Sequence, residues 1–363
     1  SGYITIEGLT NTQCGTLVPF NRGSESIADG EGLVDSLPCL GDVLNRAGYQ
    51  QVFLGGAETT YAGKGEFLLR HGFDEVVGLE HWRARGLNSR PNTWGLSDPD
   101  LFNESVKVIN ELQGQKRPWH LAMLTIGTHL PGYLYAECQP YSGSDERFLD
   151  ALHCTDQLMG QWIRRLEEKG ILEDTVLVIT SDHQVFPNSE MRGLFGDGVY
   201  DRRLPMIVLG PDHADASVDE GAGYDFAPTV LDILDVEHDA EFVMGRSLSR
   251  PLDRPNYFLT RYSDFFEGAR VDNPSECDSS RNPLFPLSAC QKGEFMSVLG
   301  LIAERFSNPV PRLSCGFDYI QVNASNPDAL EIIIGGEDQR DRFIRSGRPV
   351  DILQAGWALL FLD

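Results

Sequence analysis

An adjacent carboxylate and imidazole, Asp182 and His183, follow almost directly on a run of mainly β-branched residues at 176–179. Such a run is typical of a buried strand. In open α/β sheets, ligands bind beyond the carboxyl ends of the strands. Oxygen and nitrogen donors side by side at that place are suited to a divalent metal ion. The pair therefore predicts half of a metal site. The alternative is that Asp182 caps the next turn and His183 is a surface residue.

Polar side chains occur in three further segments where a site at a sheet edge would place them. The first is the N-terminal segment 1–15, whose hydroxyl residues include Ser1, Thr5, Thr10 and Thr12. In the second, a glycine turn presents Lys64 at a predicted helix start. In the third, His129 follows a predicted buried strand at 119–125. These segments are candidates for one site together with Asp182 and His183.

Predicted helices and strands alternate through the first two thirds of the sequence. The predicted helices are 36–47, 64–71, 98–112, 144–169 and 225–235, and the predicted strands are 51–54, 119–125, 175–180 and 204–209. In the helix at 98–112, Leu101, Val106, Ile109 and Leu112 form the apolar stripe. This alternation predicts an α/β fold, in which helices cover both faces of a mostly parallel sheet.

A domain boundary is predicted near 249–256, where closely spaced prolines break the pattern. We predict a catalytic domain over 1–250 and a small β-rich subdomain over 251–363. The subdomain begins with loops rich in Pro, Cys and Ser. Strand-like runs follow at 319–322, 330–334 and 357–362.

The chain has 54 acidic and 30 basic residues, which give a formal net charge of −24. This charge argues against nucleic-acid binding, which needs a basic face. It also means that an anionic substrate would need a metal ion or a placed Lys or Arg nearby. No apolar stretch approaches the roughly 20 residues of a membrane-spanning helix, and no signal peptide is visible.

Seven cysteines stand at positions 14, 39, 138, 154, 277, 290 and 315. None forms a Cys-x-x-Cys pair, which argues against a structural zinc site. Pairing of sequence neighbours would join Cys14 to Cys39, Cys138 to Cys154, and Cys277 to Cys290. Three disulfides and one thiol fit an oxidising compartment. The alternative is seven reduced cysteines in a cytosolic enzyme.

An ordered set of short segments carries a family resemblance over roughly residues 5–250. The segments are 12–15 (TQCG), 39–44 (CLGDVL), 62–64 (AGK), 71–74 (HGFD), 128–131 (THLP), 181–183 (SDH), 225–234 (DFAPTVLDIL) and 245–248 (GRSL). With them, the chain resembles the phosphoglycerol transferases of the alkaline phosphatase and sulfatase-like superfamily. The likeness is nearest to the periplasmic glucan phosphoglycerol transferases and more distant to the lipoteichoic acid synthases.

The resemblance implies roles for single residues. Asp182 and His183 match ligands to one divalent cation, Mn²⁺ or Mg²⁺. His129 matches a histidine that contacts the transferred glycerol phosphate, and Lys64 falls where distant relatives carry an arginine on the phosphate. The alternatives are a solvated lysine at position 64 and a histidine at 129 that bonds a loop carbonyl. Trp94 is predicted to be a packing residue.

The resemblance also implies partners and a location. The donor would be a phosphatidylglycerol-like lipid at a membrane surface, and the acceptor a periplasmic glucan or another glycan. Four cysteines match those of the glucan enzymes, namely Cys14, Cys39, Cys138 and Cys154. This supports disulfides and a periplasmic or extracytoplasmic protein. Its anchor would be an N-terminal membrane segment absent from this chain.

The chain departs from the family at its N-terminus. The family has a glutamate metal ligand on a first strand and a threonine nucleophile about a dozen residues before the segment that 13–15 matches. The chain starts at Ser1, so the nucleophile is expected at Ser1 or just upstream, and Thr5 better matches a non-catalytic threonine. We therefore expect a fragment that lacks the first strand, binds metal weakly and has little activity.

Three alternative functions remain at this level. A sulfatase is disfavoured because no Cys/Ser-x-Pro-x-Arg motif occurs, and the segment 14–19 lacks both its spacing and its arginine. A phosphodiesterase or phosphatase would pass the same intermediate to water. A non-catalytic binding module would have kept the fold and lost the chemistry.

Overall fold

The structure is a computed structural model of the 363-residue chain. It describes residues 4–16, 37–87, 92–186, 188–196, 204–211, 221–240, 242 and 245–250, and the backbone of strands between 257 and 347. The chain forms two compact units. One comprises 1–40, 180–205 and 217–363, and the other comprises 41–179 and 206–216.

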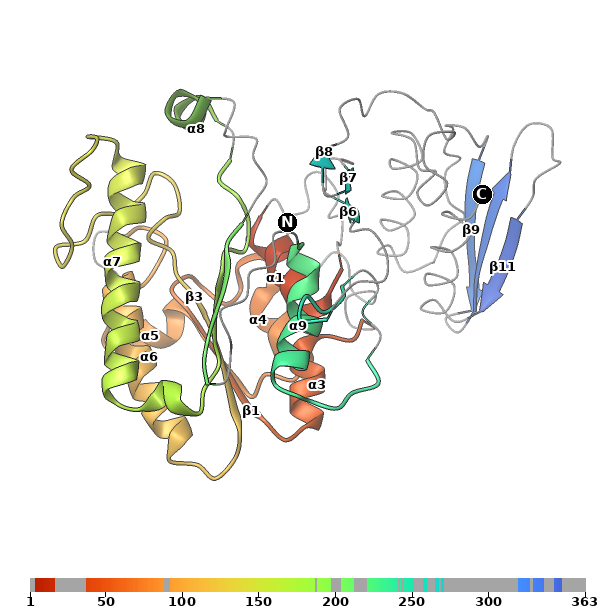
Figure 1. Cartoon of the computed structure of the whole chain (residues 1–363), viewed down its shortest axis with the longest axis horizontal. Coiled ribbons are helices and arrows are strands. Elements are labelled where there is room, and N and C mark those ends of the chain that lie inside the picture. Colours follow the sequence, from red (N-terminus) through yellow and green to blue (C-terminus); the bar gives the residue numbers. More distant parts are fainter. Residues whose placement is uncertain are drawn as a thin grey trace. The chain divides into compact units, whose positions relative to one another are not determined.

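Helices and strands alternate along the described chain (Figure 1). The helices are α1 (Thr5–Cys14), α3 (Leu40–Arg46), α4 (Lys64–Arg70), α5 (Leu79–Ala84), α6 (Asp98–Gln113), α7 (Arg147–Glu168), α8 (Ser189–Phe195) and α9 (Phe226–Ile233). The strands before residue 250 are β1 (Gln50–Gly55), β2 (Glu75–Val77), β3 (Trp119–Leu124), β4 (Leu177–Thr180) and β5 (Met206–Leu209).

The sheet of unit 41–179 has the order β2-β1-β3, and both pairings are parallel. In the register, Val52 lies opposite Glu75 on one side and Leu121 on the other. The central strand β1 is buried from its second residue to its last, which is expected of a strand covered on both faces. A second pair of strands has the order β4-β5. The parallel strands β2-β1-β3 and the helices between the strands confirm the predicted α/β fold.

Helix α6 contributes a buried apolar face to the core of this unit. Ser97 caps its N-terminus by accepting a hydrogen bond from the Asp100 N–H, and Pro99 occupies the first turn. The predicted apolar stripe is buried as expected: Leu101, Val106, Ile109 and Leu112 are each less than 5% exposed. Helix α7 packs against α6, where the Trp162 indole lies 5.5 Å from the Phe102 ring and donates to Ser105 Oγ.

The C-terminal part contains two described sheets. Strands β6 (Tyr257–Leu259), β7 (Phe265–Glu267) and β8 (Ala269–Arg270) form one, and β9 (Tyr319–Asn326), β10 (Ala329–Gly335) and β11 (Phe343–Gly347) form the other. All their pairings are antiparallel. Strands β9 and β10 fall on predicted runs, whereas the run 357–362 lies outside the described residues. The boundary near 250 stays a prediction. Among the described helices, none has the length and apolar character needed to cross a bilayer.

Replacing Leu101 by alanine is expected to lower the free energy of unfolding by about 2–5 kcal/mol, the usual cost of such a core cavity. Leu101 is fully buried in the cluster formed with Val52, Leu54 and Trp82. Urea denaturation would measure the change. The control is Leu152→Ala on α7, whose side chain is 49% exposed and whose loss should cost no more than about 0.5 kcal/mol. Equal effects of the two substitutions would contradict this placement of the core.

Candidate active site

Asp182 and His183 follow the end of β4 after one intervening residue, Ser181, as predicted. The Asp182 Oδ1 accepts a hydrogen bond from the His183 N–H (2.9 Å), and Ser181 Oγ donates to the His183 carbonyl oxygen (2.9 Å). The Asp182 Oδ2 lies 3.7 Å from the His183 Nε2. Both side chains are partly exposed. The pair therefore presents one oxygen and one nitrogen in the same direction, to a region that solvent reaches.

The second ring nitrogen of His183 has its own partner. Its Nδ1 lies 2.7 Å from the carbonyl oxygen of Gln184, which can only accept a hydrogen bond. The ring proton therefore belongs on Nδ1, and Nε2 keeps its lone pair. Metal-binding histidines are held in this way, with the other ring N–H donated to a carbonyl or a carboxylate. The donor set thus fits a divalent ion. Among the described residues, no third His, Cys, Asp or Glu forms a ligand cluster with this pair.

Helix α1 supports the backbone of Asp182. A Cβ atom added to Gly8 would lie 2.4 Å from the Asp182 carbonyl oxygen, so only glycine allows this close approach. Two of the candidate hydroxyls on α1 are bonded within the helix. Thr10 Oγ1 donates to the Ile6 and Glu7 carbonyls (3.0 Å each), and Thr12 Oγ1 donates to the Gly8 carbonyl (2.9 Å). They therefore act on the helix itself. Ser1 lies outside the described residues.

Lys64 begins α4 and is almost fully buried, with 2% of its surface exposed. The alternative of a solvated lysine is therefore wrong. Its ammonium group donates to the Glu58 carbonyl oxygen and lies 5.5 Å from the centroid of the Tyr61 ring. Burial lowers the pKa of Lys64 to about 8, although the negative charges of Glu80 and Glu58 oppose this shift.

His129 lies in the loop after β3, and its ring stacks on an exposed aromatic side chain. The ring centroids of His129 and Trp94 are 4.2 Å apart, and Trp94 in turn lies 6.5 Å from Tyr61. The side chains of Trp94 and Tyr61 are 41% and 50% exposed. Trp94 does pack against neighbouring rings, as predicted, but it also keeps a large exposed face. His129 Nδ1 does bond a loop carbonyl, that of Leu130, at 3.0 Å.

Lys64, Tyr61, Trp94 and His129 form a continuous row of contacts within one unit, which we call the aromatic patch. Sequence reasoning found its two ends, Lys64 and His129, but missed the aromatic residues between them. The structure thus joins the predicted residues in two pairs: Lys64 with His129 through the patch, and Asp182 with His183. These pairs belong to different units of the chain. That both pairs face one phosphate stays a prediction.

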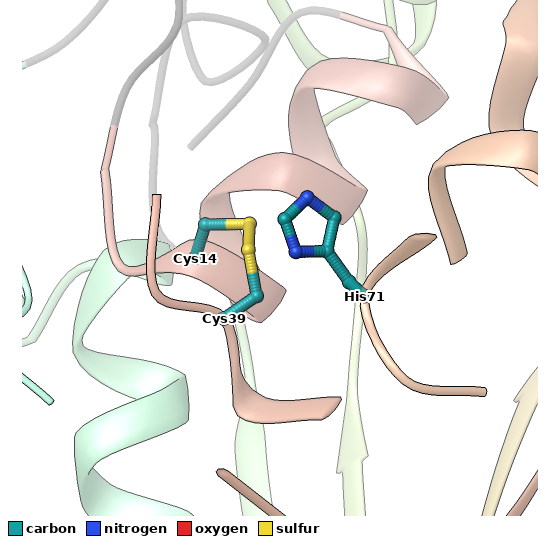
Figure 2. A group of neighbouring side chains, drawn as sticks. All are labelled: Cys14, Cys39 and His71. Atoms are coloured by element: carbon teal, nitrogen blue, oxygen red, sulfur yellow. A yellow bond between two sulfur atoms is a disulfide. The ribbon is translucent and has the colours of Figure 1, made fainter. Parts of the chain in front are cut away.

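Two of the three expected disulfides lie in the described residues, and both are formed. Cys14 is joined to Cys39 (Figure 2), and Cys138 to Cys154. The first links the C-terminal end of α1 to the residue before α3. The second links a loop after β3 to α7. Cys277, Cys290 and Cys315 lie outside the described residues.

The sulfatase family model matches residues 8–236, well over half of the chain. The chain belongs to the sulfatase family. Members of this superfamily generally use divalent metal ions, in agreement with the donor set at Asp182 and His183. The match also spans the aromatic patch, so both predicted residue pairs lie inside the family domain.

Relatives of this sulfatase-family chain include phosphoglycerol transferases. It is 33% identical over 244 residues to phosphoglycerol transferase I of Xanthomonas euvesicatoria, which covers 65% of this chain and 34% of the relative. It is 31% identical over 240 residues to the protein of the same name from Citrobacter koseri, covering 63% of this chain and 31% of the relative. The chain thus spans about a third of the length of these relatives.

Solved structures share the fold at low sequence identity. The lipoteichoic acid synthase LtaP from Listeria monocytogenes is 15% identical, with a TM-score of 0.63 over 86% of this chain and 82% of that one. A protein of the alkaline phosphatase superfamily from Vibrio parahaemolyticus is 17% identical, with a TM-score of 0.58 over 98% of this chain and 76% of that one. These likenesses support the predicted alkaline phosphatase and sulfatase-like architecture.

Proposed function

We propose that this sulfatase-family protein is a metal-dependent transferase that moves a phosphoglycerol group from a phosphatidylglycerol-like lipid to a glycan. The observation that carries the proposal is the pair Asp182 and His183, whose Oδ2 and Nε2 lie 3.7 Å apart with the imidazole proton held on Nδ1. The relatives named phosphoglycerol transferase I support the choice of the transferred group. The proposed location is the periplasm or another extracytoplasmic compartment, at a membrane surface.

Asp182 and His183 would hold the divalent ion, Mn²⁺ or Mg²⁺. When bound, such an ion lowers the pKa of a nucleophilic hydroxyl and neutralises charge on the phosphoryl oxygens. The nucleophile is a Ser or Thr hydroxyl, for which Ser1 is the candidate within this chain. Its oxygen forms a bond to phosphorus while the bond from phosphorus to the diacylglycerol oxygen breaks. A sugar hydroxyl of the acceptor then displaces the enzyme oxygen in a second step.

The aromatic patch would receive the transferred group. The Lys64 ammonium offsets negative charge on the phosphate, and loss of one such stabilising group typically lowers the rate about 10²- to 10³-fold. The His129 imidazole orients the phosphoglycerol group, and its place against Trp94 limits the rotation of the ring. In this proposal the exposed faces of Trp94 and Tyr61 would contact the group.

The test is to incubate the protein and Mn²⁺ with phosphatidylglycerol labelled in its head group, with and without a β-glucan. Separation of the products should show label on the glucan and release of diacylglycerol, at a low rate in keeping with the little activity expected of this chain. Label in free glycerol phosphate, whether or not glucan is present, would instead indicate a phosphodiesterase. Cleavage of p-nitrophenyl sulfate with no action on the lipid would indicate a sulfatase. Glucan binding without any cleavage would indicate a binding module.

A further inference from the structure

A buried carboxylate anchors the loop that carries His129. Asp98 is the first residue of α6 and has no exposed surface. Its Oδ1 accepts a hydrogen bond from the Ile126 N–H and its Oδ2 one from the Gly127 N–H, each at 2.9 Å. Both oxygens are therefore bonded to the first part of the loop after β3.

The hydrogen bonds of this loop transmit that anchoring to His129. The His129 N–H donates to the Ile126 carbonyl oxygen at 3.1 Å. The Gly132 N–H donates to the His129 carbonyl at 2.8 Å, and the Tyr133 N–H donates to that of Gly127 at 2.9 Å. The backbone of His129 is thus bonded on both sides within one compact turn. A displacement of residues 126 and 127 would displace the imidazole.

Trp94, whose ring stacks on His129, is held by the segment that precedes α6. Asn92 Oδ1 accepts from the Trp94 N–H at 2.9 Å, and Asn92 Nδ2 donates to the Tyr135 hydroxyl at 3.0 Å. Thr93 Oγ1 lies 2.9 Å from the Tyr133 hydroxyl, close enough for a hydrogen bond. Residues 92 and 93, which precede α6, therefore contact Tyr133 and Tyr135 in the C-terminal part of the His129 loop. Trp94 and His129 are both positioned by contacts at the start of this helix.

The loop has no spare room at Asp98. A Cβ atom added to Gly127 would lie 2.4 Å from Asp98 Oδ2, well inside van der Waals contact. A side chain at position 127 would have to push the carboxylate or the loop aside. The pairing of Asp98 with a glycine at 127 therefore serves the close approach of carboxylate and backbone.

We infer that Asp98 is a positioning residue, whose carboxylate sets the place of the His129 imidazole against Trp94 through the Ile126 and Gly127 amides. The inference rests on the proposed function, in which His129 orients the transferred group. Asp98 itself touches no reacting atom. Its role in turnover is indirect, through the loop.

The electrostatics of Asp98 give this role an observable signature. Burial raises the pKa of Asp98 to about 6, while the two backbone N–H groups oppose the shift. The other titratable group identified against it is the Tyr135 hydroxyl, whose pKa is raised by burial and by the negative charge of Asp98. His129 and Tyr133 lie in the loop itself. The hydrogen bonds that the two backbone N–H groups donate to Asp98 therefore become charge-assisted as the carboxyl group ionises, around pH 6.

The first measurement needs no substitution. Resonances of the Ile126 and Gly127 amide protons are followed by NMR between pH 4.5 and 8 in the whole chain. We expect both to move downfield together as the pH rises, with a common midpoint near 6. The His129 ring signals should show a component with the same midpoint. Amide signals that do not share a midpoint would overturn the inference.

The second measurement uses Asp98→Asn, which keeps the side-chain size but turns an NH₂ group toward one of the two N–H donors. One of the two hydrogen bonds must then be lost. The shared titration should disappear, the His129 ring signals should shift, and transfer should fall about 10- to 100-fold, as expected for a misplaced group. Gly127→Ala should displace the same signals by steric means, which keeps the test open if Asp98→Asn folds poorly.

The matched control is Asp225→Asn. Asp225 is equally buried, has its pKa raised by burial to about 6, and also accepts two backbone N–H groups, those of Ala222 (2.8 Å) and Arg246 (3.0 Å). Its substitution should leave the His129 signals in place. A merely structural role of Asp98 would lower thermal stability yet leave those signals unmoved, and this result would overturn the inference. Displaced signals in a protein that shows no transfer would leave positioning intact and refute the proposed function.

Discussion

Replacing Asp182 by alanine is expected to weaken Mn²⁺ binding by at least about 100-fold, because the loss of even an outer-shell partner costs 10- to 100-fold. The pair would retain only the His183 Nε2, which lies 3.7 Å from Asp182 Oδ2 in the intact protein. Titration with Mn²⁺, followed by the electron paramagnetic resonance signal of free Mn²⁺, measures the loss. Transfer to glycan should be abolished in the same variant.

The matched control is Asp174→Ala. Asp174 is an exposed aspartate that precedes the same strand, β4, at its other end, and its loss should leave Mn²⁺ binding unchanged. An Asp182→Ala protein that binds Mn²⁺ as well as the unsubstituted chain would refute the metal assignment. The unsubstituted chain tests a separate expectation. If it retains one Mn²⁺ per molecule through dialysis, the predicted lack of a glutamate ligand is wrong.

Replacing Lys64 by methionine is expected to have two opposite effects. Affinity for glycerol phosphate at pH 7 should fall about 10²-fold, because a charged donor is lost from the proposed phosphate site. The protein should at the same time become more stable, because a lysine that is only 2% exposed is costly to keep charged. Calorimetric titration and urea denaturation measure the two effects.

The pH dependence of stability and of glycerol phosphate affinity provides an independent test of both effects in the unsubstituted protein. Burial lowers the pKa of Lys64 to about 8, below its ordinary value of 10.5. The charged Lys64 therefore lowers the free energy of unfolding most below pH 8. This loss disappears as the pH rises toward 10.5, so the free energy of unfolding should increase over this range. Affinity for glycerol phosphate should instead fall about fivefold between pH 8 and 9, with the charged fraction of Lys64.

The controls for Lys64 are one exposed lysine and one permanent cation. Lys107→Met removes a lysine whose side chain is 67% exposed, and it should change neither affinity nor stability by a measurable amount. Lys64→Arg should keep the charge above pH 9, because the guanidinium does not deprotonate in this range. If Lys64→Met binds glycerol phosphate as tightly as the parent protein, Lys64 is no phosphate ligand.

Sequence periodicity predicted the elements whose apolar faces are strong. Helix α6 has its four expected stripe residues buried, and β1 and β3 fall within a residue or so of the expected strands. Helix α1 was missed because its buried residues include Glu7, Thr10, Asn11 and Gln13, which carry no apolar period. The three-residue strand β2 was missed because so short a run has no pattern of its own.

The sequence predicted those parts of the candidate site whose residues are neighbours along the chain. Asp182 and His183 are adjacent and follow a strand, so their proximity needed no tertiary information. The aromatic patch was only half predictable, because Trp94 meets His129 through a contact between residues 35 positions apart. Asp98 was hidden for the same reason. At the start of a helix an aspartate has an ordinary explanation as a favourable N-terminal charge, and its bonds to the loop at 126–127 leave no mark in the sequence.

The contact between Gly8 and Asp182 has a consequence for biosynthesis. Helix α1 is made before the segment that rests on it, because Asp182 follows Gly8 some 170 residues later. At ordinary translation rates that interval is about 10–30 s. During this interval Asp182 is not yet available to helix α1, whereas the strands β1, β2 and β3, which pair within residues 50–124, are already made. The contact between Gly8 and Asp182 would then form after the pairing of these strands.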